Sequence, residues 1–76
     1  MREEILRILK ECKPDIQAEN REDLVDGGEL DSLDIVNIVA EMEASFDVSI
    51  PVEEIVPEHF NSVAAMEKMI TRLQEE

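Results

Sequence analysis

The chain has 76 residues, of which 43% are hydrophobic, and its only aromatic residues are two phenylalanines. A chain this short forms one domain at most, over residues 1–76, and its thin core leaves little room for a deep catalytic pocket. Twenty acidic residues against seven basic ones give a net charge of −13, which disfavours nucleic acid and anionic membranes and favours basic protein surfaces as partners.

A first helix is predicted over about residues 2–13. Its apolar residues recur one helical turn apart, as expected of a core-facing stripe. Pro14 ends the helix, because the residue before a proline avoids helical geometry. The stripe consists of Ile5, Ile8, Leu9 and Cys12. As Cys12 is the only cysteine, no internal disulfide can form, and we expect it in the core.

Residues 14–31 are predicted to form a long connection. Ile16 and Leu24 could anchor this segment to the core, and the pair Gly27-Gly28 predicts a turn. A connection of this length in so small a domain is usually functional or disordered.

A second helix is predicted over about residues 32–45. Asp31 suits the N-cap position, because its carboxylate can accept a hydrogen bond from an unpaired backbone N–H, and Asp34 suits the helix dipole. The apolar arc of this helix is wider than one core-facing side requires. We therefore expect some apolar side chains, Leu33 and Ala40 first, to be exposed or to meet something other than the core.

The rest of the chain predicts an extended link, a short helix and a last helix. The short helix is expected over about residues 52–56 between two prolines, and the last helix over about residues 62–74, capped by Asn61 or Ser62. The predicted fold class is therefore all-α: a bundle of three main helices and one short helix, with a long first loop.

Ser32 is the residue with the most informative chemistry, but the sequence gives it no base. A serine nucleophile needs an adjacent base, and the only histidine, His59, lies far along the chain. We therefore expect no catalytic residues. The acidic segment from Asp23 to Asp34 lacks oxygen ligands at two positions of a calcium-binding loop, and no Cys/His cluster suits zinc, so no specific metal site is expected.

Two interpretations of Ser32 stay open from the residues alone. Asp31 or Ser32 could simply cap the second helix, since both types are common caps. Alternatively, the Ser32 hydroxyl could be an attachment point for an anionic group, which the unpaired N–H groups of a helix N-terminus would favour.

Three sequence elements follow one another along the chain. They are Leu30-Asp31-Ser32-Leu33-Asp34 before an apolar helix, then Phe46-Asp47-Val48-Ser49-Ile50-Pro51, then Ser62-Val63 at the start of a last helix. With this combination the chain resembles the acyl carrier protein family. The resemblance implies a four-helix carrier bundle that is not itself an enzyme. It also implies that Ser32 receives a 4′-phosphopantetheine arm from coenzyme A, transferred by a separate phosphopantetheinyl transferase with magnesium. The thiol of the arm would hold an acyl or aminoacyl group as a thioester.

The resemblance also implies a partner-binding surface along the acidic second helix. Partners would be acyl or aminoacyl ligases and synthases with basic docking patches, and the carrier itself would be a monomer. The residues carried over from the family to this surface are Asp31, Leu33, Asp34, Ala40, Glu41 and Glu43.

The cargo stays open, because the chain departs from the carriers of fatty acid biosynthesis. Asn37 and Val52 stand where those carriers often have acidic residues, and the segment around His59 is more similar to D-alanyl carrier proteins or to carriers paired with an AMP-forming ligase. A fatty acyl, specialised acyl or aminoacyl cargo, and a D-alanyl group for cell-wall polymers, are therefore alternatives. An unmodified acidic helical adaptor and a calcium-responsive bundle are rivals from other classes.

A cytoplasmic location is expected by default. The opening residues lead into an amphipathic pattern rather than an apolar signal region, and no apolar run approaches the length of a membrane span.

Overall fold

The computed structural model describes residues 1–75, and every regular element within them is helical. The elements are α1 (Arg2–Cys12), α2 (Ser32–Phe46), the 3₁₀ turn η1 (Val52–Glu54), α3 (Pro57–Phe60) and α4 (Val63–Gln74). The all-helical fold with three main helices and a long first loop is therefore confirmed. Within the described residues, no helix combines the length and the hydropathy needed to cross a bilayer.

The predicted short helix over about residues 52–56 is shorter in the structure, and a second short helix follows it. A single 3₁₀ turn covers only Val52–Glu54, and a separate short helix, α3, follows from Pro57. Val56 is extended, with φ −129° and ψ 154°, because the residue before a proline is driven out of the helical region. Pro57 itself suits the first position of a helix, where its missing N–H would have no partner.

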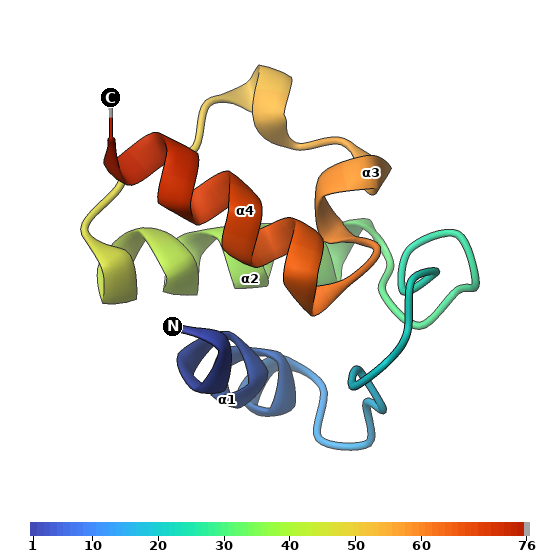
Figure 1. Cartoon of the computed structure of the whole chain (residues 1–76). Helices are drawn as coiled ribbons and strands as arrows, with labels where there is room; N and C mark the ends of the chain where they lie inside the picture. Colours follow the sequence, from blue (N-terminus) through green and yellow to red (C-terminus); the bar gives the residue numbers. More distant parts are fainter. Residues whose placement is uncertain (76) are drawn as a thin grey trace.

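The three main helices enclose one core. α1 packs against both α2 and α4, α3 packs against α4, and the loop between α1 and α2 runs around one end of the bundle (Figure 1). Met42, Met66 and Met69 lie in this core, where their flexible thioether side chains make the packing adaptable. The fully buried side chains include Ile5, Ile8 and Leu9 of α1, Ile38 and Met42 of α2, and Met66 and Ile70 of α4.

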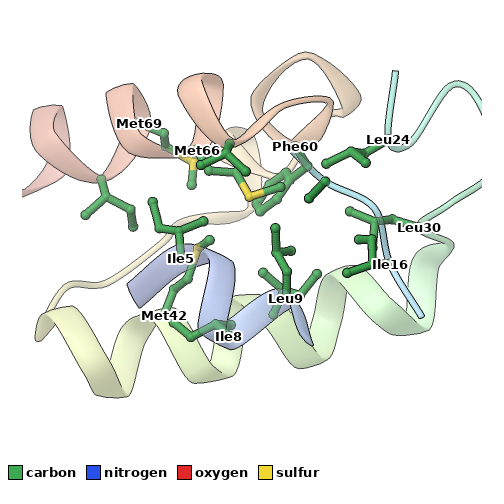
Figure 2. Packing of buried hydrophobic residues seen from close by; sticks show 14 of the residues in the cluster. Ile5, Ile8, Leu9, Ile16, Leu24, Leu30, Met42, Phe60, Met66 and Met69 are labelled. Carbon is green, nitrogen blue, oxygen red and sulfur yellow. The ribbon is translucent and has the colours of Figure 1, made fainter. Parts of the chain in front are cut away.

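Residues 13–31 form the long loop, which has anchors in the core. Ile16 and Leu24 are buried, as the sequence predicts, and Ala18 and Leu30 are buried as well. Figure 2 shows Ile16, Leu24 and Leu30 gathered near Phe60 at one end of the core. This loop, which has no helix of its own, is therefore a packed part of the domain.

α2 carries more apolar surface than the core takes up. Only Ile38 and Met42 are buried on this helix. Leu33 is 75% exposed and Ala40 is exposed, as predicted, and Val36 is also 63% exposed. The exposure of Val36 is an addition that the sequence analysis did not single out.

Candidate functional site

The first turn of α2 is fixed by a reciprocal cap. Asp31 is the N-cap residue, and its Oδ1 accepts a hydrogen bond from the backbone N–H of Asp34 at 2.9 Å. In return, Asp34 Oδ2 accepts from the backbone N–H of Asp31 at 3.2 Å. The capping role therefore belongs to Asp31, as the sequence favours, and Ser32 is the first residue of the helix.

Ser32 is exposed, and its hydroxyl is not engaged in the fold. Within residues 1–75 no hydrogen bond holds the Ser32 side chain. The hydroxyl stands at the N-terminal end of a 15-residue helix, where backbone N–H groups and the dipole favour an anion. A phosphodiester on this oxygen would lie in solvent beside that end, so the residues present fit a phosphate-linked group.

Asp34 is committed to the fold as well as to the cap. Lys13 Nζ, from the end of α1, donates a hydrogen bond to Asp34 Oδ2 at 3.0 Å, and only 17% of the Asp34 side chain is exposed. The hydrogen bond from the Asp31 N–H and the one from Lys13 lower the pKa of the Asp34 carboxyl. The bond to Asp34 raises the pKa of Lys13 in turn. The pair ties α1 to the first turn of α2, next to Ser32.

The only cysteine lies near this site but is chemically quiet. Cys12 is partly buried against the core. Burial raises the pKa of its thiol, and the negative charges of Glu41, Asp34 and Glu11 raise it further. The thiol therefore stays protonated at neutral pH and is a weak nucleophile there.

The surface that follows Ser32 along α2 is apolar with acidic edges. Leu33, Val36 and Ala40 are exposed at helical spacing, so they share one side of the helix. Asp31 and Glu41 are exposed beside them. These residues form one surface, here called the α2 face.

Two of the six residues expected on the partner surface are engaged within the fold. Glu43 Oε2 accepts a hydrogen bond from the backbone N–H of Ile50 at 2.8 Å, which ties the chain after α2 back to the helix. Asp34 is held by Lys13 and by the cap. The structure thus brings Asp31, Leu33, Ala40 and Glu41 to the open surface and turns the carboxylates of Asp34 and Glu43 inward.

His59 interacts with Glu54 and not with Ser32. Its Nδ1 lies 2.7 Å from the backbone oxygen of Glu54 and 3.4 Å from the Glu54 carboxylate, which Arg72 also binds. Within the described residues no hydrogen bond or ion pair joins His59 to Ser32, so the two residues do not form a serine–histidine pair. Over the same residues, no group of three or more His, Cys, Asp or Glu side chains could hold a metal ion.

Two residues at this site were missed by sequence reasoning. Lys13 pairs with Asp34 across the bundle, and Asn61 binds the loop before Ser32. Lys13 stands out in the sequence only as the residue before Pro14, and Asn61 only as a possible cap. Neither signal indicates a partner so far away along the chain.

Comparison with known proteins identifies the family. A family model described as the phosphopantetheine attachment site matches residues 1–70. The chain belongs to the acyl carrier protein family. Carriers of this family hold 4′-phosphopantetheine covalently and are not themselves enzymes, so the cofactor and the non-enzymatic role inferred from the sequence are both confirmed.

The chain is similar in sequence to aminoacyl carrier proteins and to D-alanyl carrier proteins. It is 52% identical over 52 residues to aminoacyl carrier protein 1, and 48% identical over 56 residues to aminoacyl carrier protein 2, both of Bradyrhizobium diazoefficiens. Those matches cover 67% and 74% of this chain, but only 57% and 60% of the two relatives. It is also 33% identical to the D-alanyl carrier protein of Streptococcus mutans, over 97% of this chain and 95% of the relative.

Proposed function

We propose that Ser32 is the attachment residue for 4′-phosphopantetheine and that the cargo is an aminoacyl group. The observation that carries the proposal is the free, exposed Ser32 hydroxyl at the start of α2, next to a cap that another residue supplies. The aminoacyl cargo is supported by the 52% and 48% identities to the two aminoacyl carriers, against 33% to the D-alanyl carrier.

In the attachment reaction, the role of this chain is to hold the Ser32 hydroxyl in a fixed, exposed position for the transferase. Asp31 and Asp34 fix the first turn, and Lys13 holds that turn against α1, so Ser32 Oγ projects from a rigid base. No base of the described residues contacts Ser32 Oγ, so the transferase must provide one. Asp31 is exposed beside Ser32 and is the carboxylate best placed to face the magnesium ion of the transferase.

The α2 face is the proposed docking surface for the transferase and for the enzymes that load and unload the arm. Its apolar residues give contact area, and the exposed Asp31 and Glu41 complement a basic patch. The net charge of −13 would speed encounter with such a patch. We propose that the carrier is a cytoplasmic monomer. Its partners there would be ligases and synthases with basic patches.

An intact-mass experiment tests the attachment. The protein is incubated with coenzyme A, magnesium and a broad-specificity phosphopantetheinyl transferase, and we expect a gain of roughly 340 Da, the mass of the arm. Ser32→Ala should gain nothing. Ser45→Ala and Ser49→Ala remove exposed serines of the same region, and both should gain the full mass. A gain that survives Ser32→Ala would contradict the proposal. A folded wild type that gains nothing would favour the unmodified adaptor.

A second measurement tests the cargo. The carrier is recovered from its native cells, and its intact mass is compared before and after hydroxylamine, which cleaves thioesters. We expect the mass lost to match an aminoacyl residue, which is an amino acid less one water, and the released compound to be the hydroxamate of that amino acid. Loss of a fatty acyl mass would instead assign the carrier to fatty acid biosynthesis.

A D-alanyl cargo is the second candidate, since the match to the D-alanyl carrier spans nearly the whole of both chains. Acid hydrolysis of the released hydroxamate, followed by chiral analysis of the amino acid, separates the two candidates. D-Alanine alone would support the D-alanyl carrier and overturn the general aminoacyl one.

A further inference from the structure

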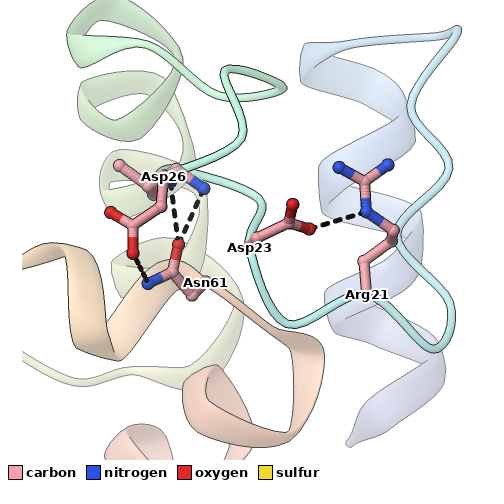
Figure 3. A network of polar contacts seen from close by, with 5 residues as sticks. Arg21, Asp23, Asp26 and Asn61 are labelled. Carbon is pink, nitrogen blue, oxygen red and sulfur yellow. Dashed lines mark hydrogen bonds and ion pairs between the residues drawn. The ribbon is translucent and has the colours of Figure 1, made fainter.

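Asn61, at the junction between α3 and α4, binds the loop that precedes Ser32. Its side-chain Oδ1 accepts hydrogen bonds from the backbone N–H groups of Val25 at 2.9 Å and Asp26 at 3.0 Å. Its Nδ2 donates to Asp26 Oδ2 at 3.1 Å, and its backbone oxygen accepts from the N–H of Leu24 at 3.0 Å. Figure 3 shows the Asn61 side chain reaching the loop beside Asp26. One residue thus binds three consecutive loop residues.

Backbone hydrogen bonds connect the residues bound by Asn61 to the segment that leads into Ser32. The N–H of Leu30 donates to the backbone oxygen of Leu24 at 2.8 Å, which closes the segment 24–30 into a loop. Both leucines are buried, and Figure 2 shows them near Phe60, the neighbour of Asn61. Leu30 is followed directly by Asp31 and Ser32. The base of this loop therefore fixes where α2 begins.

Apart from its apolar contacts with the core, which include the partly buried Val25, the segment 24–26 is joined to the helices by the hydrogen bonds of Asn61. Residues 13–31 contain no helix or strand, so their buried backbone groups need partners from elsewhere. Gly28 has φ +88°, and a side chain at Gly27 would come within 2.6 Å of the Asp23 carboxylate, so the turn depends on glycine at both positions. Asn61 supplies the side-chain contact between this turn and the helices.

We propose that Asn61 is a positioning residue for the modification of Ser32: it holds residues 24–26 so that Ser32 is presented to the transferase in one place. The inference rests on the proposed attachment at Ser32. Removal of the Asn61 side chain keeps the backbone bond to Leu24 but removes the side-chain hydrogen bonds to Val25 and Asp26. A transferase that requires one loop position would then bind only the fraction of molecules that has it.

Asn61→Ala tests this inference by the kinetics of arm transfer, at a temperature where circular dichroism shows the variant folded. We expect KM for the carrier to rise about five-fold to ten-fold with kcat nearly unchanged. We also expect the amides of Val25 and Asp26 to exchange hydrogen faster than in wild type. Ser62→Ala is the matched control, because it removes the cap of α4 at the same junction, where Ser62 Oγ accepts from Ala65 N at 3.0 Å, without touching the loop. Its KM should equal that of wild type.

A swapped pair keeps the test decisive if Asn61→Ala does not fold. Asn61→Asp places a carboxylate against that of Asp26 and removes the donor between them, so KM should rise. Adding Asp26→Asn restores a donor facing an acceptor, and the double variant should recover most of the wild-type KM. This recovery would distinguish positioning from a general loss of stability.

The outcomes separate this inference from the proposed function. Wild-type KM in Asn61→Ala, or no rescue by the swapped pair, would overturn the positioning role while Ser32 still gains its arm. A KM rise of equal size in Ser62→Ala would overturn it too, because stability alone would then explain the effect. A folded wild type that never gains the arm would overturn the proposed function itself.

Discussion

α2 and α4 are both long helices rich in apolar residues, but they use those residues differently. α4 has 12 residues and buries four apolar side chains, whereas α2 has 15 residues and buries only two. On α4 the apolar stripe faces the core, and the polar residues face water. On α2 the core takes Ile38 and Met42, and Leu33, Val36 and Ala40 stay exposed. Folding therefore accounts for the apolar residues of α4, while α2 carries a surplus that needs another explanation.

The largest expected effect is the difference in free energy of unfolding between truncating a residue of α4 and truncating one of α2. Ile70→Ala on α4 removes a fully buried side chain and should lower the free energy of unfolding by about 2–5 kcal/mol. Val36→Ala on α2 should change it by less than about 0.5 kcal/mol. Urea denaturation followed by circular dichroism measures both. Equal losses would mean that α2 packs its exposed side against the domain.

The next effect concerns the exposed apolar residues of α2. Leu33→Ala should weaken docking of the transferase, with KM rising about ten-fold, because truncating an anchor at the centre of an interface costs at least about 1 kcal/mol. The free energy of unfolding should stay at the wild-type value. Val52→Ala is the control, since Val52 is 81% exposed but lies on η1 rather than on α2. Comparable KM changes in both variants would show that the α2 face is not a distinct docking surface.

A smaller effect is expected from charge. Glu41→Lys should slow association with a basic partner a few-fold at low ionic strength, and the difference should fade as salt is added. Stopped-flow association rates measure it. Glu58→Lys makes the same charge change at an exposed position of α3 and should have less effect. A rate for Glu41→Lys that does not depend on salt would argue against electrostatic docking at α2.

The smallest effect concerns the pair that joins α1 to α2. The folded-state pKa of Asp34 is lowered, so the carboxylate contributes stability above about pH 4 and loses it as pH falls through the folded pKa. Lys13→Gln should lower the free energy of unfolding only slightly at pH 7, because solvent screens an ion pair of a partly exposed lysine. The difference in free energy of unfolding between Lys13→Gln and wild type should disappear below about pH 4.

Lys10→Gln is the control for that pair, because Lys10 is exposed on the same helix, away from Asp34 in sequence. Its unfolding curves should follow those of wild type from pH 7 to pH 3. A gap between wild type and Lys13→Gln that stays constant over this range would show that the Lys13–Asp34 bond contributes nothing.

The sequence predicted the features that depend on neighbouring residues. The Asp31 cap, the Ser62 cap and the start of α2 follow from side chains within a few positions of the helix ends. The exposure of Leu33 and Ala40 follows from an apolar arc too wide for one core-facing side. The split between η1 and α3 is not predicted, because a proline can follow the end of one helix or begin the next, and Pro57 begins α3.

The features that the sequence did not predict are contacts between distant segments. Lys13 meets Asp34, and Asn61 meets Val25 and Asp26, only because α1, the long loop and the α3–α4 junction come together around one core. A single sequence contains no spacing rule for such pairs. The same limit applies to Glu43, whose partner is the backbone of Ile50 beyond the end of the helix.

The suppressed reactivity of Cys12 gives the carrier a simple readout. Burial and nearby carboxylates keep this thiol protonated at neutral pH, so it reacts slowly with maleimides and similar reagents. The thiol at the tip of an attached arm would lie in solvent and react faster. Brief labelling at neutral pH would therefore tag the unloaded arm and leave both the acylated arm and Cys12 unmarked. One fluorophore per molecule would then report the fraction of carrier that is waiting for cargo.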